Sequence, residues 1–279
     1  MKKGFFIISL LLFCLATGFP VYGQFTPQEI AERAQWEEFL TTADIVKSER
    51  IGVGVTKPWR LYLKKGDIEK TGAWKDVDKS LGAGAYDKWQ HEIAAYRLDK
   101  LIGLNMVPIY VEREFRGKKG ALSLWANVKY SLIEVMDQGI KVPDSARQQY
   151  YDTGYIYYVW DSLIANDDPT QENILYTDDW RTIYIDHSRA FRSNKGYTER
   201  LVFGTNGIKK RDNGKPYLMR RVPRVLLDNI KALDFAGVKQ AVGPYLTDKE
   251  IESIIARKQL ILDEIAAMVK QYGEDKVLY

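Results

Sequence analysis

Cysteine and histidine are scarce in this chain of 279 residues, and their scarcity limits the chemistry that it can perform. The single cysteine, Cys14, lies in an N-terminal segment that we expect to be removed, so the rest of the chain has neither a disulfide nor a thiolate nucleophile. With no thiol left and only His91 and His187 as imidazoles, we do not expect a zinc site. Stability must then come from a hydrophobic core.

An excess of charge of one sign is also lacking, and there is little long hydrophobic sequence. The chain has 41 Lys and Arg against 37 Asp and Glu, and a formal net charge of +4 gives no support to a nucleic-acid partner. One long apolar run, residues 5–16, is shorter than the roughly 20 residues that a membrane helix needs. No second run follows, so we expect no membrane span after it.

The N-terminus has the pattern of a secretory signal peptide. Lys2 and Lys3 precede the apolar run, and Val21 and Gly23 provide small or neutral residues at the −3 and −1 positions of a cleavage site. We therefore predict a signal peptide over residues 1–23 and an exported mature protein, periplasmic or extracellular. The sequence around Cys14 does not favour lipid attachment.

The remaining chain has the composition of a globular protein, with 46% hydrophobic and 13% aromatic residues. Its first half is rich in strand patterns. We expect a helix that begins with a capping box at Thr26 and runs to about Leu40. After it we expect a hairpin over 59–75, a helix over 86–101 that ends at Gly103, and strands over 107–112 and 121–125.

The second half is mostly helical. The expected elements are an aromatic helix over 150–164, a short hairpin over 173–176 and 182–185, an exposed loop over 192–221, and a helix that begins with a capping box at Thr247 and ends at Gly273. The sequence thus predicts an α+β fold. It comprises the signal peptide, an N-terminal helix with a β-rich lobe over 24–127, and a helical lobe over 128–279.

A polar loop between the aromatic helix and the hairpin carries the first candidate site residues. Asp168 precedes Asn173 by five residues, and Asp186 follows the returning strand of the hairpin. In phosphoryl transfer, an Asp orients the attacking hydroxyl, and an Asn and a second Asp hold the metal beside the phosphates. Taken singly, each of these residues fits turn chemistry better than catalysis, and Asp167 is a rival base to Asp168.

Two further residues lie upstream in the order that phosphoryl transfer requires. Lys75 ends a predicted strand, and Glu92 lies on the helix that follows. A strand lysine binds phosphates and a helix glutamate holds that lysine. Gly54 and Thr56 belong to a short Gly-rich stretch whose backbone and hydroxyl groups can contact phosphate, although such a stretch is more often a turn.

Together these motifs resemble the atypical branch of the protein-kinase-like superfamily, which includes phosphatidylinositol kinases, HipA-like kinases and Four-jointed-like kinases of the secretory pathway. The resemblance spans about residues 50–270. Its motifs are the glutamate helix with a strand beginning Val107-Pro108, the strand over 120–125, the loop over 168–173, and residues 185–191 with the metal-binding Asp and a Phe.

The resemblance implies a two-lobed fold and the use of ATP and Mg²⁺ (or Mn²⁺). It implies that Lys75, Glu92, Gly54 and Thr56 form the ATP site, that Asp168 and Lys75 are catalytic, and that Asn173 and Asp186 bind the metal. The acceptor is an unidentified hydroxyl on a protein, lipid head group, sugar or small molecule. The chain departs from the family pattern, and it lacks the disulfides that the secretory kinases of animals carry. The Gly-rich loop is shortened, and Pro169-Thr170 replace the Arg-His that often follows the catalytic Asp.

Two other functions remain open. One is a catalytically inactive kinase-like module that binds a ligand or partner, which the scarcity of ATP outside the cytoplasm favours and the retention of all five polar residues opposes. The other is a nucleotidyl or other group transferase that uses the same metal ligands on the same scaffold. The mass of the product separates it from a kinase.

Overall fold

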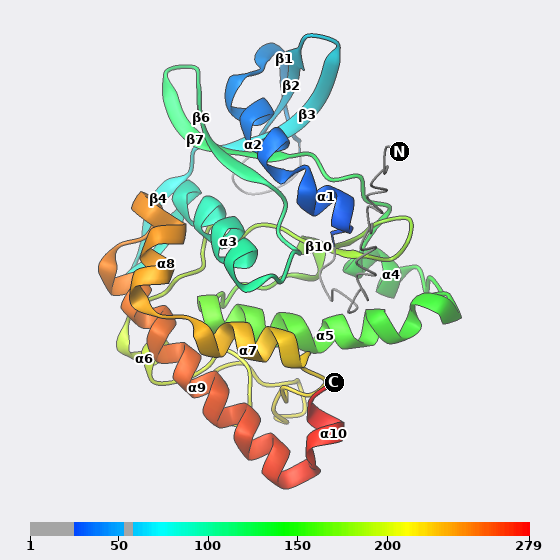
Figure 1. The fold of residues 1–279 in the computed structure, drawn as a ribbon, viewed down its shortest axis with the longest axis vertical. Coiled ribbons are helices and arrows are strands. Elements are labelled where there is room, and N and C mark those ends of the chain that lie inside the picture. Colours follow the sequence, from blue (N-terminus) through cyan, green and yellow to red (C-terminus); the bar gives the residue numbers. More distant parts are fainter. Residues whose placement is uncertain (1–24, 53–57) are drawn as a thin grey trace, which may run out of the picture.

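The computed structural model describes residues 25–52 and 58–279, and Figure 1 shows its arrangement. A β-rich region lies at one end and long helices lie at the other, which confirms the predicted α+β architecture. The predicted signal peptide, Gly54 and Thr56 lie outside the described residues. The boundary at residue 127 stays a prediction.

The N-terminal helix begins as predicted. Thr26 Oγ1 accepts a hydrogen bond from the Glu29 amide at 3.2 Å, and Glu29 accepts one from the Thr26 amide at 2.7 Å. The predicted single helix is divided in two, α1 (Pro27–Ala31) and α2 (Arg33–Thr42). The break at Glu32 is local, because its backbone stays close to helical angles (φ −83°, ψ −5°).

Five antiparallel strands form the main sheet, in the order β1-β2-β3-β7-β6. They are β1 (Asp44–Arg50), β2 (Trp59–Lys65), β3 (Ile68–Lys75), β6 (Tyr110–Phe115) and β7 (Lys118–Leu124). The predicted hairpin is confirmed as β2 and β3. A Cβ on Gly120 would lie 2.4 Å from the carbonyl oxygen of Lys75, so a glycine there lets β7 approach the end of β3 closely.

A second hairpin lies between the sheet and the first long helix, and the sequence did not predict it. It comprises β4 (Asp78–Gly82) and β5 (Ala85–Lys88), and its turn has positive φ at Gly82, Ala83 and Gly84. The predicted helix therefore begins three residues late, as α3 (Trp89–Ile102). It ends at Gly103 as predicted, with the left-handed backbone (φ 67°) that glycine adopts readily.

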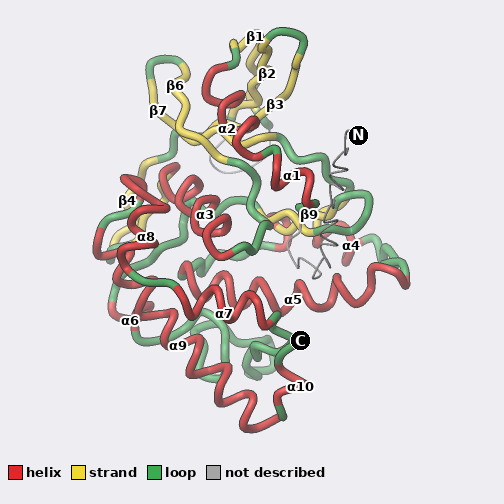
Figure 2. Tube along the Cα trace, viewed as in Figure 1, coloured by secondary structure: helices red, strands yellow, loops and turns green. Residues whose placement is uncertain are grey.

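A small sheet and a buried helix form the middle of the molecule. The sheet has the order β10-β9-β8, and Figure 2 shows its strands close to α4. Its elements are β8 (Tyr130–Ser131), α4 (Leu132–Asp137), the 3₁₀ turn η1 (Gln171–Asn173), β9 (Ile174–Tyr176) and β10 (Thr182–Tyr184). The aromatic helix is α5 (Asp144–Ile164), six residues longer at its start than predicted, and its Val159, Trp160 and Leu163 are buried.

Helices make up most of the C-terminal part: α6 (Lys195–Thr198), α7 (Arg224–Ala232), α8 (Phe235–Val242), the 3₁₀ turn η2 (Gly243–Tyr245), α9 (Asp248–Tyr272) and α10 (Glu274–Val277). The predicted capping box at Thr247 is present, and α9 ends before Gly273 as predicted. Buried isoleucines on one face of α9 join the core, and α9 packs against α5.

The segment 192–221 is less exposed than we predicted. Leu201, Val202 and Phe203 are buried, and the Phe203 amide donates to Ser162 Oγ on α5 at 3.0 Å. The prediction was wrong for these residues and for the buried Met219, because they show no helix or strand period, whereas residues 209–215 are exposed as predicted. Across the described part of the chain, no helix combines the length and apolarity needed to span a membrane.

Candidate active site

Lys75 lies at the centre of the candidate site. Its ammonium donates to Glu92 Oε1 and to Asp186 Oδ1, each at 2.8 Å. These side chains come from the end of β3, the first turn of α3 and the loop after β10. The side chain of Glu92 is fully buried and that of Asp186 is 40% exposed, so one carboxylate anchors the lysine from inside and the other faces the opening.

The charges of this triad depend on one another. Burial alone would lower the pKa of Lys75, but Glu92 and Asp186 outweigh it and hold that pKa well above its ordinary value. Burial raises the pKa of Glu92, against the opposing charge of Lys75. Lys75 lowers the pKa of Asp186 despite burial. The lysine is thus held in its charged form, and Asp186 keeps its charge more readily than the fully buried Glu92 does.

Backbone geometry places Asp186 and Asn173 side by side. The Ile185 amide donates to the Asn173 carbonyl at 3.0 Å, which continues the β9–β10 pairing to the loop. Asp186 then adopts a left-handed conformation (φ 64°), and the His187 amide donates to Glu92 Oε2 at 3.0 Å. A non-glycine residue in this region is found where its surroundings fix it, often at functional sites.

These residues open onto a cleft of about 440 Å³. Lys75, Asp168, Asn173 and Asp186 all line it, so the structure brings together four of the predicted site residues. Glu92 lies behind Lys75. Apolar side chains line the cleft as well: Ile51, Pro58, Leu124, Val128 and Leu175. A cavity with a charged part and an apolar part suits a ligand that has both, such as a nucleotide.

Asp167 and Asp168 have different surroundings. Asp168 lines the cleft, where Arg189 Nη1 lies 2.5 Å from its Oδ2. Arg189 also reaches the buried Asp87 on β5, with Nε 3.3 Å from Asp87 Oδ2. Asp167 is instead held by Arg192, at 2.7 Å, and by the hydroxyl of Tyr197.

The sequence did not predict a role for Arg189 or for the buried residues that hold the loop carrying Asp168. The Asn166 side chain donates to Asp161 Oδ1 at 2.9 Å and accepts from the Asp168 amide at 3.3 Å. Tyr184 donates to Asp161 at 2.8 Å, and burial raises the pKa of Asp161 to about 8. The signal available was an Asp within the mostly apolar C-terminal half of α5, since a buried carboxyl needs partners.

Both histidines are buried and structural in their contacts. His91 Nδ1 lies 3.0 Å from the Ser188 carbonyl and His91 Nε2 lies 3.1 Å from Glu250, so His91 connects the Asp186 loop to α9. Trp160 Nε1 donates to His187 Nε2 at 3.1 Å. Burial lowers the pKa of His187 to about 3, which keeps that ring neutral.

The donor set fits a magnesium ion that is shared with phosphates. Among residues 25–52 and 58–279, no group of three or more His, Cys, Asp or Glu side chains is placed to hold a metal alone. Asp186 and Asn173 nevertheless present a carboxylate and an amide oxygen to the same cleft. Mg²⁺ is commonly bound by one or two such oxygens together with substrate phosphates and water.

The β-rich region, α3 with Glu92, and the helical region together form a mixed α+β fold that is similar to two solved structures. Hydra Fam20, in a structure with sugar, aligns with a TM-score of 0.62 at 15% identity, over 94% of this chain and 95% of that one. The Helicobacter pylori proinflammatory kinase CtkA aligns with a TM-score of 0.51 at 12% identity, over 85% and 97%. No protein-family model and no curated sequence matches the chain. At identities this low, the structural similarity shows the fold alone, and function must be argued from the site.

Proposed function

We propose that the protein is an exported phosphotransferase that uses ATP and Mg²⁺ (or Mn²⁺) to phosphorylate a hydroxyl acceptor. The observation that carries the proposal is the Lys75 ammonium, 2.8 Å from both Glu92 and Asp186 at the wall of a cleft that also holds Asp168 and Asn173. Export is proposed from the pattern of residues 1–23 alone.

Lys75 is proposed to bind the phosphates of ATP while Glu92 holds it in place. The buried Glu92 cannot reach the cleft, so its role is to orient the ammonium. When nucleotide binds, we expect Lys75 to exchange Asp186 for phosphate oxygens. Gly54 and Thr56 are proposed as additional phosphate contacts.

Asp186 and Asn173 are proposed to hold the metal. Bound Mg²⁺ would neutralise phosphate charge as the γ-phosphoryl group is transferred. The β9–β10 pairing supports this role, because it holds Asn173 and the start of the Asp186 loop next to each other at one edge of the cleft. Positioning and electrostatics supply most of the catalysis in such sites.

Asp168 is proposed to accept a hydrogen bond from the acceptor hydroxyl and to take its proton as the new O–P bond forms and ADP leaves. Its place in the cleft supports this role over Asp167, which does not line the cleft. The sugar in the hydra Fam20 structure makes a carbohydrate hydroxyl one acceptor to test, beside proteins, lipid head groups and small molecules.

Thermal unfolding of the purified mature protein tests the proposal. We expect ATP and Mg²⁺ together to raise the melting temperature. At a hundredfold excess of ligand over Kd, the free energy of unfolding should rise by about 3 kcal/mol. Either alone should have a small effect. Asp186→Ala should abolish the shift, and Asp212→Ala, at an exposed loop position, should keep it.

The absence of any shift at saturating nucleotide would overturn the proposal and leave a kinase-like binding module. If the shift appears, mass spectrometry of the modified acceptor separates the remaining alternatives. A phosphate adduct supports the kinase, whereas a nucleotide adduct would show a nucleotidyl transferase.

A further inference from the structure

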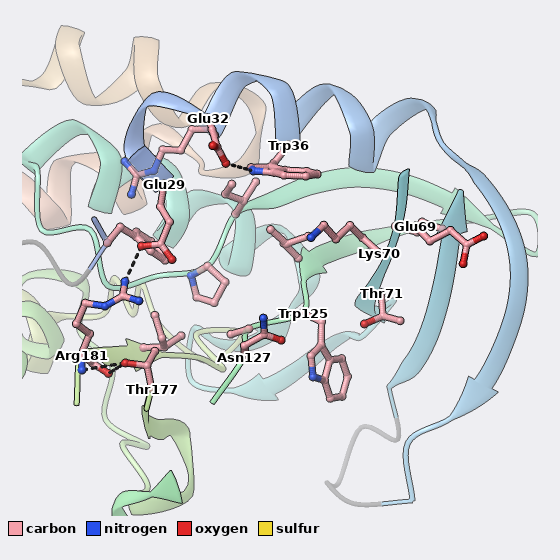
Figure 3. A pocket seen from close by; sticks show the side chains of 18 of the residues that line it. Glu29, Glu32, Trp36, Glu69, Lys70, Thr71, Trp125, Asn127, Thr177 and Arg181 are labelled. Carbon is pink, nitrogen blue, oxygen red and sulfur yellow. Dashed lines mark hydrogen bonds and ion pairs between the residues drawn. The ribbon is translucent and has the colours of Figure 1, made fainter. Parts of the chain in front are cut away.

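A second cavity lies beneath the N-terminal helices, on the other side of the linker that follows β7 (Figure 3). Its volume is about 810 Å³, nearly twice that of the candidate active cleft. Residues of α1 and α2 cover it, β2 and β3 form one wall, and the turn between β9 and β10 closes one end. This volume is typical of a site for a small organic ligand.

The helix face over this cavity is polar. Glu29, Glu32, Arg33 and Trp36 follow one another at the i, i+3, i+4 and i+7 positions of one face, and all four line the cavity. A helix that packs on a sheet for stability alone presents apolar residues there. Figure 3 shows Glu32 and Trp36 on this face opposite Lys70 and Thr71 of β3.

Arg33 has hydrogen-bonding capacity left over. It is only 5% exposed, yet its Nε and Nη2 donate no hydrogen bond to any described residue. Its ion pair with the buried Asp99 is long, at 3.8 Å. Because buried guanidinium groups normally satisfy their donors, unused donors at a cavity wall point to a ligand with acceptors.

Carboxylates and cations are interleaved around the cavity. At one end Arg181 Nη1 bonds Glu29 at 2.5 Å, and in the middle Lys70 lies 4.9 Å from the centre of the Trp36 ring. Trp36 Nε1 donates to Glu32 at 3.1 Å. An anionic ligand would meet Glu29 and Glu32, and a cationic one would meet Lys70 and a buried guanidinium. Neither sign of net charge is favoured.

Aromatic rings supply the apolar surface. Trp36 and Trp125 line the cavity from opposite sides (Figure 3), and Tyr62 also lines it. Rings of this kind bury the apolar face of a ligand while its polar edge remains free for hydrogen bonds. The side-chain amide of Asn127 and the hydroxyl of Thr71 also line the cavity, and each can donate and accept hydrogen bonds.

From this combination we propose that the cavity beneath α2 is a binding site for a neutral carbohydrate. A sugar ring has an apolar face for the indoles, and each hydroxyl can donate to a carboxylate and accept from Arg33 or Lys70. It requires no net charge of either sign. The site is separate from the proposed phosphotransfer cleft and does not depend on its activity.

Isothermal titration calorimetry without nucleotide tests the proposal directly. The probes are glucose, galactose, xylose, N-acetylglucosamine, lactose and cellobiose, with tryptophan fluorescence as a second readout. We expect at least one of them to bind saturably. Glu32→Gln and Trp36→Ala should each weaken that binding by about tenfold, the cost of one hydrogen bond to a charged group or one lost ring contact.

The matched control is Glu38→Gln on the same helix, because Glu38 pairs with the exposed Lys65 and does not line the cavity. It should bind as the unmodified protein does. Glu32→Gln is nearly isosteric, so it keeps the test valid if Trp36→Ala fails to fold. The proposal is overturned if no probe binds, or if binding survives both Glu32→Gln and Trp36→Ala. If that surviving binding is lost in Asp168→Asn, the sugar lies in the candidate active cleft and the proposed function stays intact.

Discussion

The active cleft and the cavity beneath α2 lie on two sides of the same linker, and their charged side chains differ in how they are paired. In the cleft, Lys75 holds two carboxylates and Arg189 holds two more. In the second cavity, Arg33 keeps donors unused. The cleft is thus preorganised by bonds that a ligand must exchange, whereas in the cavity the Arg33 donors can be engaged without breaking a hydrogen bond.

Removing the central cation of the cleft should have the largest effect. Lys75→Met leaves the buried Glu92 without its partner, so we expect a loss of about 3 kcal/mol in stability and about a thousandfold in phosphotransfer rate. Thermal unfolding and a rate assay with ATP measure the two effects. Lys64→Met, at an exposed position of the neighbouring strand, should change neither. A Lys75→Met protein with undiminished rate would remove the lysine from the mechanism.

Removing the ion pairs of Arg189 with Asp168 and Asp87 should lower the phosphotransfer rate less than removing Lys75 does. Arg189→Gln releases Asp168 and Asp87, and because Asp168 then loses its fixed orientation, kcat should fall about ten- to hundredfold. KM for ATP should be nearly unchanged, since Arg189 acts through Asp168. Arg189→Lys should recover part of kcat. An equal rise in KM with kcat unchanged would instead assign Arg189 to nucleotide binding.

The buried carboxyl of Asp161, behind the loop that carries Asp168, should make the free energy of unfolding depend on pH. Burial raises the pKa of Asp161 to about 8 from an ordinary value near 3.8. Between these values the folded protein keeps a proton that the unfolded chain has lost, so this group's contribution to stability falls as pH rises. Asp161→Asn should remove a slope of about 1 kcal/mol per pH unit.

The measurement is the difference in unfolding free energy between Asp161→Asn and the unmodified protein across this range. The opposite slope from His187, whose pKa is lowered to about 3, is common to both proteins and cancels. A constant difference at every pH would mean that Asp161 is ionised in the folded state.

Features encoded by neighbouring residues were predictable from the sequence. The capping boxes at Thr26 and Thr247, the β2–β3 hairpin and the glycine end of α3 each depend on a few adjacent residues whose backbone preferences agree. The β4–β5 hairpin was missed because the positive φ of Ala83 in its turn is unusual for alanine.

The candidate site was predictable in part, because chain order could be compared with a known scheme of roles. Order along the chain suggested Lys75, Glu92, Asp168, Asn173 and Asp186, and the structure brings these residues together around one cleft. Arg189 was missed because its partners, Asp87 and Asp168, lie far away in sequence and meet it only in the fold. Nothing in the spacing of Glu29, Arg33 and Trp36 indicated a cavity, since a polar helix face usually faces solvent.

The residues that separate the two cavities have a thermodynamic consequence. Pro108, Leu124, Trp125 and Ala126 line both, and the Trp125 amide is bonded to the Thr71 carbonyl on β3 at 2.9 Å. If an occupant of one cavity shifts this wall, the affinity of the other cavity for its own ligand changes by some factor. Linkage requires the reverse effect to have the same factor, so a nucleotide on one side would report on the occupant of the other.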